Sequence, residues 1–317
     1  MKRLRFVVAL TNDDNDYQIE QAACAEAAAR KLSIDLQMLY AQNDGVVQSQ
    51  QLLNVVHSSS EQRPDAIIFE PAGGTALPQV ARAAAAAGIG WVVLNRESNY
   101  LAELRSQFPV PLFAITSDHE EIGRIQGRQI AALVPQGGSV LYIQGPAESL
   151  AAKQRTVGMY ETKPANVEVK LMKAQWTEAS AHKAVSAWLK LTTSKAAGIQ
   201  AIAAQDDSMA MGARKAFHDL PEGEARTRWL SLPFIGCDGL PKTGQAWVRS
   251  GMLTATIFTP PNAGLAIELM TQALQGQSVP ERTLVEAVSI PALDVLEKEA
   301  RDKARGGART AAAFGRT

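Results

Sequence analysis

Short apolar runs separated by helix-length amphipathic stretches recur along the whole chain. The runs are RFVVAL, IDLQMLY, DAIIFEP, WVVLN, LFAIT, SVLYIQG, VKLMKA, AIAAQ, FIGCD, TATIFT and VEAVSI. Between them, apolar residues return every three or four positions, as in 18–32, 76–87, 119–134, 178–193, 207–218, 240–250 and 262–275. This alternation predicts an α/β fold in which helices cover both faces of parallel sheets.

The number of runs suits two sheets better than one, and a chain of 317 residues is roughly two average domains long. We therefore expect two Rossmann-like lobes, with a first boundary near Ser117 and Asp118. The polar segment 219–231, punctuated by Pro and Gly, predicts a surface loop. The segment 297–317 is charged and then rich in Gly and Ala, which predicts a frayed helix followed by a disordered tail.

Charge, apolar run length and cysteine spacing limit what this chain can bind or form. Lys plus Arg and Asp plus Glu both number 32, so no overall basic field is present to hold nucleic acid. No apolar run approaches the ~20 residues of a membrane-spanning helix. Cys24 and Cys237 lack CxxC spacing, and two small buried thiols are favoured over one bridge between them.

The first ten residues were compared with the pattern of a secretory signal, which would direct the protein out of the cytoplasm. MKRLRFVVAL has the basic start of a secretory signal, but FVVAL is shorter than the ~7 to 15 apolar residues of such a signal, and TNDDND follows at once. These residues predict no export signal. Two alternatives stay open, an exported protein whose signal has been removed and a cytoplasmic protein.

Motifs of catalysis are missing from the sequence. It contains no GxxxxGK[ST], no GxGxxG after the first run, no GxSxG and no HExxH, and its four histidines show no metal-ligand spacing. We therefore expect no metal, no cofactor and no enzymatic activity. An enzyme that relies on carboxylates alone is the distant alternative.

Polar and aromatic residues stand at the carboxyl ends of the expected strands, beyond which open α/β sheets bind ligands. They are Asn15, Tyr17, Asn95, Arg96, Arg155, Trp176, Asp206 and Asp238. An ionised Asp accepts hydrogen bonds, Arg donates them in a planar fork, Asn does both, and a flat aromatic ring covers the C–H face of a sugar. This combination favours a neutral polyol over an anion.

Several of these positions also have a purely structural alternative. Asp207 is the expected N-cap of the helix that follows, with Asp206 facing the ligand. Asp238 precedes Gly239 and suits a turn, Asn95 suits a strained turn, and Trp176 suits a core. The recurrence of such residues at matching strand ends favours the ligand-binding interpretation.

Five stretches carry a specific resemblance. They are DAIIFEPAGGTAL, AAAAGIGWVVLNRE, ITSDHEEIGRIQGRQIA, AAQDDSMAMGARKAF and FIGCDGLPKTGQAWVRSGMLTATIFTPP. In their order and spacing the chain resembles, over about residues 5–290, the type I periplasmic sugar-binding proteins of the ribose- and galactose-binding group. This group shares its fold with the effector domains of lactose-repressor-type regulators.

The resemblance implies a set of sugar contacts. The family's first loop corresponds to Asn15 and Tyr17, with Asp13 or Asp14 as substitutes, and its Asp-Arg pair corresponds to Asn95 and Arg96. Its further ligand residues correspond to Arg155, the stacking aromatic Trp176, Asp206 in place of an Asn, Asp238, and Phe258 with Thr259 in place of a Gln. The departures at Asn95, Asp206 and Thr259 weaken the expectation of ribose itself.

The resemblance also implies an architecture and a function. The expected lobes are 1–117 with 260–287 and 118–259 with 288–296. Strands that cross near 117, 259 and 287 are expected to join them. The lobes are expected to close by a hinge on a ligand between them. The implied function is that of the solute-binding component of a sugar ABC importer, a periplasmic monomer that binds a monosaccharide or related small polyol and meets a membrane permease or sensor protein. The alternative is a cytoplasmic ligand-sensing regulatory protein of the same fold without a DNA-binding domain, since no helix-turn-helix region precedes RFVVAL.

Overall fold

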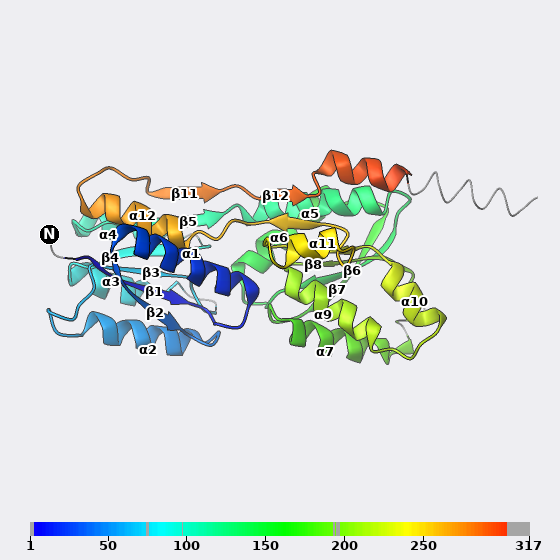
Figure 1. Ribbon diagram of the computed structural model, residues 1–317, viewed down its shortest axis with the longest axis horizontal. Coiled ribbons are helices and arrows are strands. Elements are labelled where there is room, and N and C mark those ends of the chain that lie inside the picture. Colours follow the sequence, from blue (N-terminus) through cyan, green and yellow to red (C-terminus); the bar gives the residue numbers. More distant parts are fainter. Residues whose placement is uncertain (1–2, 74–75, 97, 193, 195–196, 303–317) are drawn as a thin grey trace, which may run out of the picture. The chain divides into compact units, whose positions relative to one another are not determined.

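The computed structural model describes residues 3–73, 76–96, 98–192, 194 and 197–302. Its internal contacts divide the chain into two compact units (Figure 1). Unit 1 consists of Met1–Asp118, Glu148–Ala151 and Pro260–Glu286, and unit 2 consists of His119–Ala147, Ala152–Thr259 and Ala287–Thr317. Each unit is described by itself below.

Unit 1 is built on a six-stranded parallel sheet with the order β11-β5-β4-β3-β1-β2. Its strands are β1 (Arg5–Leu10), β2 (Asp35–Tyr40), β3 (Ala66–Phe69), β4 (Gly90–Leu94), β5 (Leu112–Ser117) and β11 (Arg282–Val285). Strands β3, β4 and β5 are buried along their whole length, as expected for a sheet covered on both faces. The edge strand β2 is partly exposed throughout.

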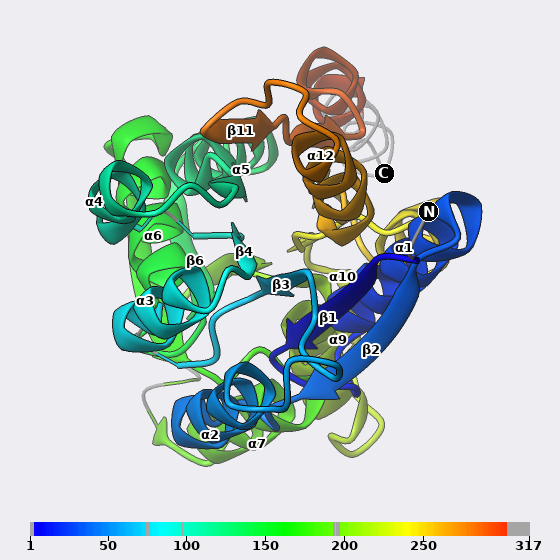
Figure 2. The same cartoon turned by 90° about the vertical axis from the view of Figure 1, so that its left-hand side faces the viewer.

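Helices cover both faces of this sheet, as Figure 2 shows. They are α1 (Asp16–Leu32), α2 (Gly45–Val56), α3 (Pro78–Ala86), α4 (Tyr100–Gln107) and α12 (Ala263–Leu274). On one face, Phe6 and Val8 of β1 pack against α1 and α12. On the other face, Val7 and Ala9 pack in a cluster with residues of α2, α3 and α4. The alternating direction of side chains along β1 thus separates two cores.

Unit 2 contains a four-stranded parallel sheet with the order β7-β6-β8-β9. Its strands are β6 (Gly138–Gln144), β7 (Val167–Lys173), β8 (Ile199–Ala204) and β9 (Phe234–Ile235). A separate antiparallel pair joins β10 (Thr256–Phe258) to β12 (Val288–Ile290). Single parallel bridges from Ile235 to Ala255 and from Asp238 to Phe258 link the β9 segment to the β10 segment.

The helices of unit 2 also cover both faces of their sheet. They are α5 (His119–Leu133), α6 (Leu150–Thr162), α7 (Glu178–Leu189), α9 (Asp207–His218), α10 (Glu224–Ser231) and α11 (Gly244–Arg249). One core joins the sheet to α5 and α6 through Ile130 and Met159. The other joins it to α7 and α9 through Val185 and Phe217.

The predicted α/β class, with parallel sheets in two lobes, is confirmed. The prediction of a surface loop over 219–231 is wrong for its second half, which forms α10. Trp229 explains the difference, because its ring stacks on Phe217 with 4.7 Å between ring centroids and is only 5 % exposed. Burying one large aromatic side chain on a helix outweighs the polar composition around it.

Two further sequence expectations concern the tail and the cysteines. Residues 297–302 lie in a helix over 293–302, and 303–317 lie outside the described residues. Both thiols are free, with Cys237 buried and Cys24 partly exposed. Within the described ranges, the structure has no helix with the length and apolar character needed to span a membrane.

Candidate functional site

The carboxyl ends of the parallel strands, with the loops that follow them, form a carboxyl edge in each unit, and ligands of open α/β sheets bind at such edges. In unit 1, Asn15 lies at this edge and caps α1. Its side-chain oxygen accepts from the backbone N–H groups of Tyr17 at 2.9 Å and Gln18 at 3.4 Å. Capping satisfies N–H groups that have no partner inside the helix. A sugar contact by Asn15 stays a prediction beside this structural role.

Tyr17 and Asn95 are brought together at the same edge. The amide nitrogen of Asn95 donates to the Tyr17 hydroxyl at 3.3 Å, and that hydroxyl donates to the Pro260 carbonyl at 3.4 Å. Asn95 has a φ of 54°, in the left-handed region that Asn tolerates better than most residues. Asn95 therefore occupies a strained turn and also belongs to the polar group at the edge.

Arg96 interacts electrostatically with Glu70, a carboxyl group that is not among the residues predicted from the sequence. Its guanidinium donates to the Gly73 carbonyl at 3.0 Å. Burial lowers the pKa of Arg96, while the charge of Glu70 opposes this shift. Burial raises the pKa of Glu70 in turn, against hydrogen bonds from Gln18, Asn95 and Gln21 and the charge of Arg96. Glu70 directly follows β3 as Asn95 follows β4, so the same strand-end argument identifies it.

Arg155 is the central cation of the unit 2 edge. It lies on α6, is 8 % exposed, and donates to the backbone carbonyl of Gln205. Burial alone would lower the pKa of Arg155, but Cys237, Asp238 and Asp206 outweigh burial and raise it. Its Nε atom is buried and makes no hydrogen bond within the part of the chain that the structure describes. Arg155 is thus a permanent charge with a donor available to a ligand.

The position of Arg155 depends on a close crossing of α5 and α6. A Cβ at Gly158 would overlap the Glu120 carbonyl oxygen, and a Cβ at Gly123 would overlap the carbonyl oxygen of Arg155 itself. The Thr162 hydroxyl adds a hydrogen bond to the Arg124 carbonyl at 2.8 Å. The absence of side chains at the two glycines lets the backbones touch, which fixes the turn of α6 that carries Arg155.

Trp176 lies beside Arg155. The guanidinium carbon is 5.6 Å from the centre of the Trp176 ring, within the range of cation–π attraction. The ring is partly exposed, has its inner side against the unit 2 core, and fills the space that a Cβ at Gly145 would take. Its φ of 59° is left-handed, which for a bulky residue marks a backbone held by its surroundings. Trp176 therefore packs against the core of unit 2 and also lies at its carboxyl edge.

The prediction that Asp207 is the N-cap of α9 is wrong. Asp206, not Asp207, is the N-cap of α9, since its side chain accepts from the Met209 N–H and its backbone is extended. Asp207 accepts from the Gly239 N–H at 2.7 Å and from the Thr256 hydroxyl at 2.6 Å. The helix begins at Asp207, as expected for the stretch 207–218, so the residue before it, Asp206, is the cap. A ligand contact by Asp206 stays a prediction.

Asp238 and Thr259 are joined through their backbones. The Thr259 N–H donates to the Asp238 carbonyl at 3.0 Å, and the Asp238 N–H donates to the Ile257 carbonyl at 2.9 Å. Asp238 has a φ of 103° and is 9 % exposed. The Thr259 hydroxyl is buried and has no hydrogen-bond partner among the residues described by the structure. Asp207 supports this loop through the neighbouring Gly239.

Gln205 is a second residue that the sequence analysis missed. Its side-chain oxygen accepts from the Gly145 N–H at 2.9 Å, and the two N–H bonds of its amide nitrogen are shared among the Tyr142 hydroxyl, the Ala152 carbonyl and the Thr156 hydroxyl, which lie 2.9–3.0 Å away. Because its backbone carbonyl also holds Arg155, Gln205 connects the ends of β6 and β8 to α6. Its place after the apolar run AIAA is the signal that identifies it.

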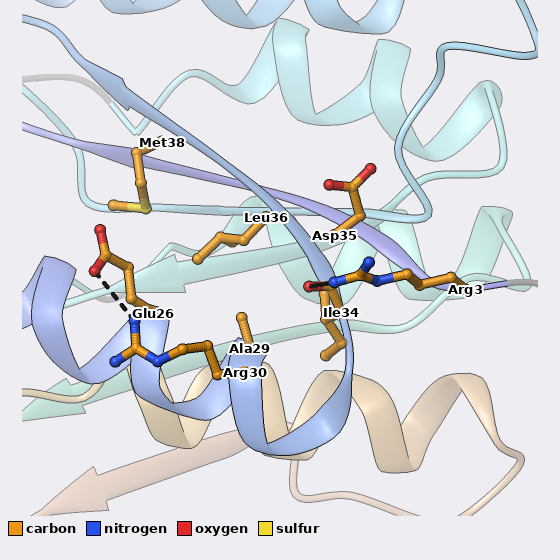
Figure 3. Close-up of a pocket in the computed structure, with 8 residues that line it drawn as sticks. All are labelled: Arg3, Glu26, Ala29, Arg30, Ile34, Asp35, Leu36 and Met38. Carbon is orange, nitrogen blue, oxygen red and sulfur yellow. Dashed lines mark hydrogen bonds and ion pairs between the residues drawn. The ribbon is translucent and has the colours of Figure 1, made fainter.

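Figure 3 shows a hollow at a different place in unit 1, between α1 and the first half of β2. It is lined by Arg3, Glu26, Ala29, Arg30, Ile34, Asp35, Leu36 and Met38. The hollow lies toward the amino end of β2, away from the carboxyl edge. None of the nine predicted ligand residues lines it, so it is not the candidate site.

Comparisons with known proteins identify relatives of this chain and solved structures of the same fold. The ribose import binding protein RbsB of Escherichia coli (strain K12) is 26% identical over 278 residues, which cover 87% of this chain and 86% of that protein. The putative rhizopine-binding protein of Rhizobium meliloti is 30% identical over 232 residues, 71% of this chain and 69% of that protein. A solute-binding protein of Actinobacillus succinogenes 130z, solved with D-allose, has a TM-score of 0.78 at 21% identity and covers 94% of this chain and 100% of its own.

A family model described as a periplasmic binding protein domain matches residues 6–278. This range includes all nine predicted ligand residues. The chain therefore belongs to the periplasmic binding protein family.

Proposed function

We propose that this protein binds a monosaccharide or related small polyol as the solute-binding component of a sugar ABC importer. The ligand residues are those at the two carboxyl edges, Asn15, Tyr17, Asn95 and Arg96 in unit 1 and Arg155, Trp176, Asp206, Asp238 and Thr259 in unit 2. The name of the ribose import binding protein of Escherichia coli supports the ligand class.

One observation carries the proposal. Four side chains lie together at the carboxyl edge of unit 2. They are the buried guanidinium of Arg155, the carboxylates of Asp206 and Asp238, which act on it electrostatically, and the partly exposed indole ring of Trp176. Hydroxyl groups of a sugar both donate and accept, so they match Arg155 on one side and Asp206 or Asp238 on the other. The ring of Trp176 suits the apolar face of a sugar. Binding of this kind makes and breaks no covalent bond.

The proposal extends to location and partner. As an importer component, the protein acts in the periplasm as a monomer and passes its sugar to a membrane permease. The relatives named as import binding and periplasmic proteins support this extension. Pull-down of the permease from membranes of the source cell, with and without sugar, tests it.

Arg155→Ala is expected to weaken sugar binding by about 1.5 to 3 kcal/mol, because a hydrogen bond to a charged group contributes about that much. Isothermal titration calorimetry of the wild type with D-ribose and D-allose identifies the probe and measures the loss. The exposed Lys153, on the same helix, provides the matched control Lys153→Ala, which is expected to keep wild-type affinity. Unchanged affinity in Arg155→Ala would remove this residue from the site.

A further inference from the structure

Three side-chain amides of unit 1 converge on the carboxyl group of Glu70. This residue directly follows β3 and is partly exposed. The Gln21 amide nitrogen lies 3.3 Å from Glu70 Oε2, and the side chains of Gln18 and Asn95 also form hydrogen bonds with this carboxyl group. Gln18 and Gln21 come from α1, one turn apart, and Asn95 comes from the end of the neighbouring strand β4.

Backbone contacts fix the orientation of the two glutamine amides. The Gln18 oxygen accepts from the Thr11 N–H at 3.2 Å. The Gln21 oxygen accepts from the N–H groups of Asn262 and Ala263, both at 2.8 Å. A backbone N–H only donates, so the oxygen of each amide must face the backbone. The NH₂ group of each glutamine is therefore the part that faces Glu70.

The orientation of Asn95 is fixed in the same way through Asn262. The Asn262 amide nitrogen donates to the Ile115 carbonyl at 3.3 Å and to the Asn95 oxygen at 2.8 Å. The NH₂ group of Asn95 thus points to the opposite side, where it donates to the Tyr17 hydroxyl and to Glu70. Asn262 is fully buried, so water does not offer it alternative partners.

The surroundings of Glu70 consist of donors and one cation. The two oxygens of a carboxylate can accept from all three NH₂ groups, whereas a carboxamide at this position would turn its own NH₂ toward at least one of them. Arg96 adds a positive charge that acts on Glu70, and Asn95 beside it is neutral. The donors and Arg96 favour the ionised form, against the effect of burial, which raises the pKa of Glu70.

We propose that Glu70 is a positioning residue of the sugar site, which supplies at the end of β3 the carboxylate that the neutral Asn95 does not supply at the end of β4. It holds the Asn95 amide in one orientation and balances the charge of Arg96. Both residues then meet ligand hydroxyls with a fixed pattern of donors. The inference rests on the proposed function, because it assigns Glu70 to the ligand edge of unit 1.

Two variants test this role in a sugar titration. With whichever of D-ribose and D-allose binds the wild type, Glu70→Gln is expected to lower the affinity at least 10-fold with little change in melting temperature. Adding Asn95→Asp moves a carboxylate to the neighbouring strand end and is expected to restore most of the affinity. Glu281→Gln, at a 71% exposed side chain of the same unit, is the matched control. Wild-type affinity in Glu70→Gln, or no recovery in the double variant, would overturn the proposal.

A measurement without ligand separates this inference from the proposed function. In NMR spectra of the ligand-free protein, the side-chain NH₂ signals of Gln18, Gln21 and Asn95 are expected to shift in Glu70→Gln and to keep their wild-type positions in Glu281→Gln. Unmoved signals would contradict the proposal even if neither sugar binds. Failure of the wild type to bind a sugar, with the shifts present, would count against the proposed function alone.

Discussion

Replacing Asp207 with alanine is expected to lower the free energy of unfolding of the protein by about 3 to 4 kcal/mol. The buried carboxylate accepts from the Gly239 N–H at 2.7 Å and the Thr256 hydroxyl at 2.6 Å, and each hydrogen bond to a charged group contributes about 1.5 to 3 kcal/mol. Urea unfolding followed by circular dichroism measures the change. The loop that holds Asp238 loses its anchor in this variant, so sugar affinity is expected to fall with stability.

Asp207→Asn is a milder variant at the same position. A threonine hydroxyl both donates and accepts, so the introduced amide keeps its oxygen toward Gly239 and turns its NH₂ toward Thr256. Only the charge is lost, and the expected cost is about 1 to 2 kcal/mol. Equal losses in the two variants would show that the two hydrogen bonds do not carry the effect.

Gly158→Ala is expected to destabilise the protein by about 3 kcal/mol and to weaken sugar binding. The added Cβ would overlap the Glu120 carbonyl oxygen, which is backbone and cannot rotate away. Overpacking typically costs about 1 to 3 kcal/mol, occasionally more, and we expect the upper end here after the gain of about 1 kcal/mol in helix propensity. Thermal and urea unfolding measure stability, and calorimetry measures the effect of a displaced Arg155.

Val157→Ala is the matched control for Gly158→Ala. Val157 is the neighbouring residue on α6 and is 50 % exposed, so its truncation is expected to change stability by no more than about 0.5 kcal/mol. A Gly158→Ala protein as stable as the wild type would mean that α6 moves away from α5 without cost.

The fold was predictable because its signal is local. An apolar run such as AIIF or WVVL, followed by a helical repeat, identifies a buried parallel strand without knowledge of its neighbours. The α10 helix was missed because its stability comes from the contact of Trp229 with Phe217, which no local pattern reveals. The predicted N-cap of α9 was wrong by one residue. The choice between Asp206 and Asp207 depends on backbone angles, because the two residues are of the same type.

The candidate site was predictable in part for the same reason. The ends of apolar runs can be located in the sequence, and this position predicts residues such as Arg155 and Trp176 as ligand residues. In the structure these two side chains lie together. The amide network around Glu70 could not be predicted, since Gln21 and Asn262, which orients it, lie 241 positions apart and meet only in the folded unit. A carboxyl group before a proline suggests a turn until its amide neighbours are known.

The contact between Gly145 and Trp176 makes the residue types allowed at these two positions depend on each other. The indole ring occupies the volume that any side chain at residue 145 would need. A natural or designed relative that carries alanine or a larger residue at this position therefore requires a smaller aromatic, or none, at the position of Trp176. Libraries built to change the ligand preference of this protein should vary the two codons together, because most single changes at residue 145 would remove the ring from its place.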